Sequence, residues 1–240
     1  MTSFAGFGLN GAIARAIAEE KYLIPTPIQV QTILVVMSRR DVIGIAQTGT
    51  GKTAAFALPI LQQLAADPRT PERKSCRVLV LSPTRELSGQ IADCFRTYGR
   101  HVRISAALAI GGVSMGGQVR SLLHGVDVLV ATPGRLLDLL EQRALSLQSD
   151  KILVLDEVDR MLDMGFLPDV RRIVEKIPTD RQTLLFSATL PPEIERLAAW
   201  VLRHPELVEI GARRSPAETV THAVYPVAAE QKFDLLMALL

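Results

Sequence analysis

The fold is decided by one stretch, Val42-Ile43-Gly44-Ile45-Ala46-Gln47-Thr48-Gly49-Thr50-Gly51-Lys52-Thr53. Its first four residues form an apolar run that predicts a short buried strand, and the apolar spacing of residues 54–61 predicts a helix after it. A strand, a glycine-rich turn, Lys-Thr and a helix are the context that a phosphate-binding P-loop requires. We therefore expect a nucleotide site at residues 46–53.

The residue types in this turn suit a phosphate ligand. Gly49 and Gly51 allow the backbone N–H groups to point inward at an anion, and the helix N-terminus adds partial positive charge. Lys52 can reach the outer phosphates, and the Thr53 hydroxyl can ligate Mg²⁺. One departure is visible, because Ala46 stands where the general P-loop pattern has its first glycine.

An acidic motif downstream fits the same chemistry. The apolar residues 152–155 predict a strand that runs directly into Asp156-Glu157-Val158-Asp159. Asp156 can hold Mg²⁺ through water, and Glu157 can orient and deprotonate an attacking water. The alternative is an acidic helix start that complements the helix dipole. The P-loop upstream favours the catalytic interpretation.

Strands and helices alternate along the chain. Further strands are expected at residues 77–81, 104–109, 127–130 and 183–186, and helices near residues 86–98, 115–123, 136–141 and 168–177. Near-continuous apolar strands that alternate with helices predict an α/β fold with a mostly parallel central sheet and helices on both faces. Ligands of such sheets bind at the carboxyl ends of the strands.

The segment before the P-loop contains Pro25-Thr26-Pro27-Ile28-Gln29. The prolines fix an extended turn, and Pro27 suits the first turn of a helix. Near that helix start, the Gln29 amide can pair with adenine at N6 and N7. A solvent-facing glutamine is the alternative. A G-x-G-x-x-G match at residues 6–11 is set aside, because no strand precedes it.

Three turns suit a phosphate backbone. They are Pro83-Thr84-Arg85, Gly111-Gly112 and Thr132-Pro133-Gly134-Arg135. Two start helices and offer N–H groups, a hydroxyl and a guanidinium, and the glycine pair allows close approach. Ordinary helix capping explains each turn singly, but all three are expected at one sheet edge. None contains an aromatic residue, which favours backbone recognition over base stacking.

Composition limits the remaining possibilities. The chain of 240 residues is 48% hydrophobic with a formal net charge of +2, so nucleic-acid contact must come from local sites. Cys76 and Cys94 lack metal-ligand spacing and are expected to be reduced thiols. No leader or long apolar span is present, and we expect a cytoplasmic protein without a membrane partner. The oligomeric state is left open.

Together these motifs resemble the first RecA-like domain of a DEAD-box RNA helicase, close to the bacterial RhlE-type group. The resemblance covers essentially the whole chain, and it is carried by Phe4 and by residues 22–29, 46–53, 83–87, 111–112, 132–136, 156–159 and 187–189. It implies a RecA-like P-loop fold, ATP and Mg²⁺ as cofactors, and RNA as a partner. Three residues depart from the family pattern, namely Lys21, Leu34 and Val158.

The resemblance assigns roles residue by residue. The implied catalytic residues are Lys52, Asp156 and Glu157. The implied Mg²⁺ ligands are Thr53 and Asp156, which would bind the ion largely through water. The implied ATP-binding set is Tyr22, Thr26, Gln29, Ala46, Gln47, Thr48, Gly49, Thr50, Gly51, Lys52 and Thr53. The implied RNA-binding set is Pro83, Thr84, Arg85, Gly112, Thr132, Pro133, Gly134 and Arg135. Coupling between nucleotide state and RNA is implied for Asp159, Ser187 and Thr189.

The resemblance also implies a domain division. Residues 1–212 correspond to RecA-like domain 1, with the glutamine motif at residues 4–29. Residues 213–240 correspond to a linker and the start of a second RecA-like domain, with a strand at 220–227 and a helix at 230–240. We therefore expect a fragment of a longer protein.

Three functions stay open from the sequence. The first is an RNA-dependent ATPase that separates short duplexes when joined to its second domain. The second is an ATP-gated RNA clamp or assembly platform that grips RNA without unwinding it. The third is a P-loop ATPase unrelated to nucleic acid, which Gln29 and the three turns disfavour.

Overall fold

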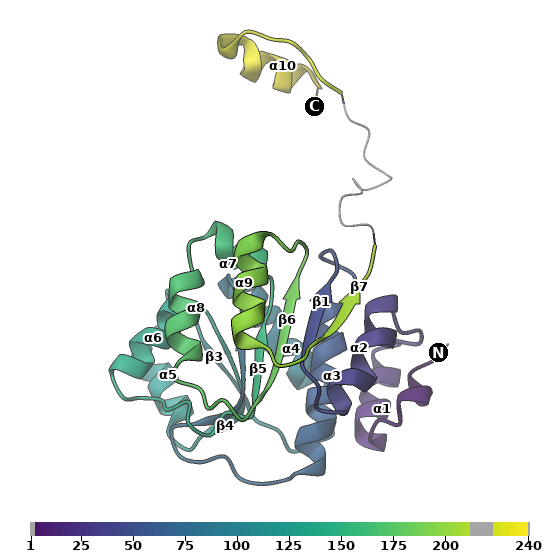
Figure 1. Cartoon of the computed structure of the whole chain (residues 1–240), viewed down its shortest axis with the longest axis vertical. Helices are drawn as coiled ribbons and strands as arrows, with labels where there is room; N and C mark the ends of the chain where they lie inside the picture. Colours follow the sequence, from purple (N-terminus) through teal and green to yellow (C-terminus); the bar gives the residue numbers. More distant parts are fainter. Residues whose placement is uncertain (1–2, 212–222, 240) are drawn as a thin grey trace. The chain divides into compact units, whose positions relative to one another are not determined.

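A computed structural model of the chain describes residues 3–211 and 223–239 (Figure 1). The chain divides into two compact units, residues 1–210 and 211–240. The first unit contains the whole sheet and every predicted site residue. Within the second unit, the described part contains a 3-10 helix, Ala229–Gln231, and α10, Lys232–Leu239.

The first unit is built on a seven-stranded sheet in the order β3-β4-β2-β5-β6-β1-β7. All of its strand pairs are parallel, with Val42 opposite Leu184 and Val78 opposite Ile152. In chain order the strands are β1 Val42–Ile45, β2 Cys76–Leu81, β3 Ala106–Ala109, β4 Val126–Ala131, β5 Ile152–Leu155, β6 Gln182–Ser187 and β7 Glu206–Glu209. The prediction of an α/β fold around a parallel sheet is confirmed.

Helices cover both faces of this sheet. They are α1 Gly11–Glu19, α2 Pro27–Met37, α3 Lys52–Ala66, α4 Arg85–Tyr98, α5 Met115–Leu122, α6 Pro133–Glu141, α7 Val158–Asp163, α8 Leu167–Val174 and α9 Pro192–Val201, with a 3-10 helix at Phe4–Phe7. Figure 1 shows α1 to α3 on one side of the sheet and α6, α8 and α9 on the other.

Two apolar cores result from the alternation of side chains along buried strands. In β2, Val78 and Val80 pack in the core under α1 to α4, whereas Leu79 and Leu81 pack in the core under α5 to α9. All six residues of β2 are buried, which explains why the strand reads as a continuous apolar run. The turns that follow the strands lie at the carboxyl edge of this sheet.

Some predicted boundaries were wrong. The strand expected to begin at residue 104 begins at Ala106, because Ser105 is occupied by hydrogen bonds with Asp127. Strand β7 and helices α7 and α9 were not predicted. The expected linker lies mostly outside the described residues, as do positions 220–222 and 240. Residues 223–227 form no strand, since no described segment pairs with them.

Cys76 and Cys94 are both free thiols, as expected. Burial raises the pKa of Cys94 to about 12, and it also raises the pKa of Cys76, where Asp150 adds to the effect. Among the helices of residues 3–211 and 223–239, none combines the length and apolar character needed to cross a bilayer.

Candidate active site

The carboxyl edge of the sheet brings every sequence-predicted site turn together, in an order set by the strand order. The three phosphate-suited turns follow β3, β4 and β2, which are neighbours at one end of the sheet. The acidic motif follows β5, the Ser187-Ala188-Thr189 turn follows β6, and the P-loop follows β1. The turns predicted to bind nucleotide and the turns predicted to contact a phosphate backbone are therefore neighbours along one edge of the sheet.

The P-loop backbone depends on its two glycines. Gly49 and Gly51 have φ angles of 84° and 91°, a region that side chains disfavour. A Cβ on Gly51 would lie 2.4 Å from the Gln29 amide nitrogen, so the position is also closed sterically. Ala46, by contrast, continues the β1 ladder, because its amide donates to the Ser187 carbonyl at 3.0 Å. The departure at Ala46 thus falls where the backbone is extended from the strand and needs no glycine.

Lys52 begins α3 and is 7% exposed. Its ammonium donates to the Ala46 carbonyl at the other end of the loop. Thr50 donates its hydroxyl to the Gln47 carbonyl at 2.7 Å, which closes the turn, while Gln47 and Thr48 are exposed. Thr53 is half-buried in the first turn of α3. The loop backbone is thus closed by its own hydrogen bonds, with the Lys52 ammonium held at the Ala46 carbonyl.

Gln29 joins α2 to the P-loop and is fully buried. Its amide oxygen accepts from the Thr26 N–H at 2.8 Å, and its amide nitrogen donates to the Tyr22 hydroxyl and to the Gly51 carbonyl at 3.0 Å. Both amide hydrogens are therefore committed within the protein. Pairing with adenine N7 requires one of these two donor bonds to be exchanged. The structure excludes the solvent-facing alternative for Gln29.

The Tyr22 ring lies in an aromatic group rather than standing alone. Its centroid is 5.1 Å from that of Phe4 and 6.3 Å from that of Tyr98, the second pair being stacked. The Thr26 hydroxyl is buried at the start of α2, where Thr26 and Gln29 form a capping box.

The acidic motif carries a perturbed carboxyl and an unusual backbone. Asp156 is 2% exposed, and burial raises the pKa of Asp156 to about 7, opposed by the attraction of Lys52. A divalent cation would favour the ionised form of such a buried carboxyl. Glu157 has φ 51° and ψ 54°, a strained conformation for a non-glycine residue that is common at functional sites. Its carboxylate lies 3.4 Å from Arg160.

The donor set fits a nucleotide with its metal better than a free metal ion. No cluster of three histidine, cysteine or carboxylate side chains suited to a metal occurs within the described ranges. Mg²⁺ is typically held by one or two protein groups together with phosphates and water. Thr53 and Asp156 are a set of that kind.

The turn after β6 is bonded to the acidic motif. The Asp159 carboxylate accepts from the amides of Ala188 and Thr189, both at 3.1 Å. In return, the Asp159 amide donates to the Ser187 hydroxyl at 3.2 Å. The three residues expected to couple nucleotide state to RNA are thus in direct contact.

Arg85 and Arg135 connect the three phosphate-suited turns. Gly112 has φ 75°, which favours glycine there, and it lies against the Arg85 guanidinium, which a Cβ at this position would displace. Arg135 donates to the Val113 carbonyl at 3.1 Å, and its buried Nε, which has no hydrogen-bond partner, lies 3.6 Å from the Asp138 carboxylate. Thr84 and Thr132 precede α4 and α6, with Pro133 and Gly134 in the first turn of α6 and Pro83 before Thr84.

Sequence reasoning missed several of these contacts. The Gly51 carbonyl as a Gln29 acceptor, the Val113 carbonyl as an Arg135 acceptor and the positive φ of Glu157 have no sequence signature. Each depends on backbone atoms brought together by the sheet. In the sequence, only Gly51 and Gly112 indicated places where another group could pack closely against the backbone.

The fold and this edge define a P-loop nucleoside triphosphatase domain of RecA-like architecture. A family model described as DEAD/DEAH box helicase matches residues 26–197. The chain belongs to this DEAD-box helicase family.

The chain is similar to several curated relatives. It is 44% identical over 241 residues to DEAD-box ATP-dependent RNA helicase 30 of Arabidopsis thaliana, covering 100% of this chain and 41% of that protein. It is 41% identical over 237 residues to a DEAD-box ATP-dependent RNA helicase, CshA, of Streptococcus pneumoniae, covering 99% of this chain and 44% of that protein. The chain thus spans less than half the length of these relatives.

Proposed function

We propose that this chain is the nucleotide-binding domain of an ATP-dependent RNA helicase. The single observation that supports this best is the convergence of Lys52 and Asp156. Their electrostatic attraction acts on the pKa of the buried Asp156 carboxyl although they follow different strands. A cation for the phosphates beside a carboxylate for Mg²⁺ is the arrangement that phosphoryl transfer needs.

Each residue has a role in the proposed reaction. The P-loop amides and Lys52 hold the phosphates of ATP, and Thr53 and Asp156 hold Mg²⁺, which neutralises phosphate charge. Glu157 orients the attacking water and accepts its proton. Gln29 reads adenine and fixes the P-loop, with Tyr22 packing against the base.

RNA binds the three turns after β2, β3 and β4 through its phosphates. Arg85 and Arg135 supply guanidiniums, and the starts of α4 and α6 supply backbone N–H groups. Asp159 transmits the state of the acidic motif to Ser187 and Thr189. A second RecA-like domain completes both sites, in keeping with the greater length of the relatives. We place the protein in the cytoplasm.

The test is ATP hydrolysis by this chain joined to a second RecA-like domain, measured with and without RNA. We expect RNA to stimulate hydrolysis, and Glu157→Gln to retain ATP binding while abolishing turnover. Wild-type turnover in Glu157→Gln would remove Glu157 from its role. RNA affinity that is insensitive to salt would contradict phosphate contact.

An ATP-gated RNA clamp remains the second candidate, because it uses the same residues. Strand displacement on a short duplex separates the two. A rate of strand release that increases with ATP concentration would support unwinding. Hydrolysis and tight RNA retention without displacement support the clamp.

A further inference from the structure

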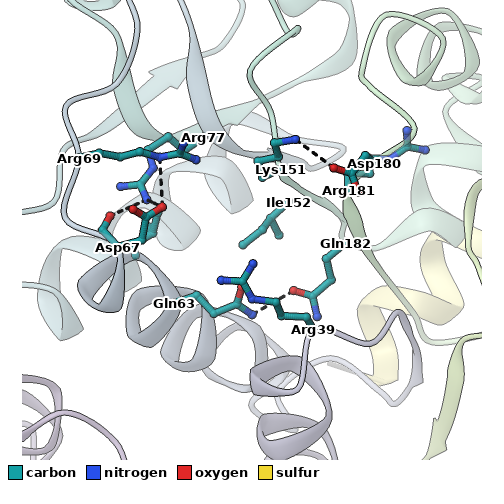
Figure 2. A pocket seen from close by; sticks show the side chains of 11 residues that line it. Arg39, Gln63, Asp67, Arg69, Arg77, Lys151, Ile152, Asp180, Arg181 and Gln182 are labelled. Carbon is teal, nitrogen blue, oxygen red and sulfur yellow. Dashed lines mark hydrogen bonds and ion pairs between the residues drawn. The ribbon is translucent and has the colours of Figure 1, made fainter.

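A cavity of about 320 Å³ lies at the amino edge of the sheet, opposite the P-loop edge. It is lined by the starts of β5 and β6, by Arg77 of β2 and by residues at the ends of α2 and α3 (Figure 2). The 15 residues of α3 run from Lys52 at one edge to the cavity at the other. At 1.5 Å per residue, this helix separates the two places by about 20 Å.

The cavity has a strong excess of positive charge. Its charged lining consists of Arg39, Arg69, Arg77, Lys151 and Arg181 with only two carboxylates, Asp67 and Asp180. The lining thus has an excess of three positive charges, which falls to two when Asp127, the buried partner of Arg77, is counted. A concave region with one sign of charge attracts small ions of the opposite sign.

Neighbouring carboxylates compensate only part of this positive charge. Asp67 is shared, because it accepts from Arg69 at 3.1 Å and from Arg77 at 3.0 Å. Asp180 lies 3.3 Å from Lys151, but its side chain is 95% exposed, so the pair is weak. The Arg77 side chain is 9% exposed and is also paired with the buried Asp127 at 3.0 Å, so its charge is compensated within the protein. Its Nε–H is buried without a hydrogen-bond partner, but the cations left for a ligand are Arg39 and Lys151.

Arg39 is the cation best placed to bind a ligand. Figure 2 shows its side chain extending into the cavity, and it has no side-chain hydrogen bond or ion pair with any other described residue. Arg39 follows α2 with φ 61°, a conformation that is uncommon for a non-glycine residue. Beneath it, the amides of Gln63 and Gln182 are hydrogen-bonded at 3.0 Å and form a fixed polar floor.

We propose that this cavity binds a small phosphate-bearing anion, with Arg39 and Lys151 donating directly to its phosphate oxygens. Arginine matches phosphate with two parallel N–H groups, and lysine adds a compact charge. The volume lies within the range of about 300–1,000 Å³ that is typical of small-molecule sites. This site is separate from the proposed ATP site and carries its own ligand.

The test uses inorganic pyrophosphate as the probe, titrated calorimetrically into residues 1–240 carrying Lys52→Ala to remove phosphate binding at the P-loop. We expect one bound pyrophosphate. Adding Arg39→Gln and Lys151→Gln should weaken its affinity at least about tenfold, equivalent to about 1.4 kcal/mol. The matched control is Arg196→Gln, an exposed arginine of α9 paired with Glu193, which should leave the affinity unchanged.

Two results would overturn the proposal. One is the absence of pyrophosphate binding in the Lys52→Ala chain while chemical denaturation shows it folded. The other is an equal affinity after the Arg39 and Lys151 substitutions. A short RNA added as competitor identifies the source of the phosphate. We expect no displacement, as the cavity size favours a free small molecule, and full displacement would contradict that assignment.

Discussion

Asp159 and Thr189 are held together through one carboxylate oxygen. Asp159 Oδ2 accepts from the Thr189 amide at 3.1 Å and from its hydroxyl at 3.3 Å. The same oxygen accepts from the Ala188 amide. Because Asp159 follows β5 and Thr189 follows β6, any displacement of the acidic motif is passed directly to the neighbouring turn.

Asp159→Ala should destabilise the chain by about 1–3 kcal/mol, because it leaves several donors without their acceptor. Urea denaturation measures this free energy of unfolding. Asp163→Ala is the matched control, since Asp163 is exposed on the same helix, α7. Equal stabilities for the two variants would show that the Asp159–Thr189 contact contributes nothing.

Val158→Ala should also destabilise the chain, by about 1 kcal/mol, through a small void. Val158, the first residue of α7, is fully buried in the core under α5 to α9, and it presents no polar side-chain atom to the site. Its effect on hydrolysis, measured with a second domain attached, should be smaller than that of Glu157→Gln. A loss of rate as large as that of Glu157→Gln would contradict this ranking.

Gln29→Ala should weaken ATP binding more than GTP binding. Guanine presents O6 where adenine presents an amine, so only ATP loses the base contact. GTP should nevertheless weaken as well, because the Gln29 bond to the Gly51 carbonyl is removed. Calorimetric titration of both nucleotides gives the two losses. Identical losses of affinity for ATP and GTP would show that Gln29 positions the P-loop but does not read the base.

The sequence predicted which turns gather at the carboxyl edge of the sheet better than it predicted the contacts that position their side chains. The P-loop and Asp156 follow from local patterns, a strand followed by a turn with the required side chains. Strand β7 was missed because its burial is mixed and its register depends on pairing with β1. The Asp159 contacts join residues about thirty apart, and no local spacing encodes them. The amino-edge cavity gathers cations from separate elements for the same reason.

Asp150 should make stability depend on pH. Burial raises the pKa of Asp150 well above 3.8, while its hydrogen bond from Cys76, at 3.1 Å, acts in the opposite direction. The folded chain therefore holds a proton that the unfolded chain releases above pH 3.8. The contribution of Asp150 to the free energy of unfolding is therefore largest below pH 3.8, and it falls as the pH rises toward the raised pKa of the folded chain.

Asp150→Asn removes this titration while keeping an oxygen for the Cys76 thiol. The difference in unfolding free energy between wild type and variant should change by up to about 1.4 kcal/mol per pH unit above pH 3.8. Denaturant titrations across this range measure it. A difference that stays constant with pH would show that Asp150 is ionised in the folded chain.

Steady-state ATP hydrolysis with and without RNA tests the central claim most directly, comparing residues 1–240 with the same chain joined to a second RecA-like domain. In the proposed mechanism the second domain supplies an arginine finger, a group worth roughly 10³ to 10⁵ in rate in related phosphoryl transfers. We predict that residues 1–240 bind ATP but show little RNA-stimulated hydrolysis, whereas the two-domain protein is strongly stimulated. Equal stimulation of both, or none in the two-domain protein, would contradict the account.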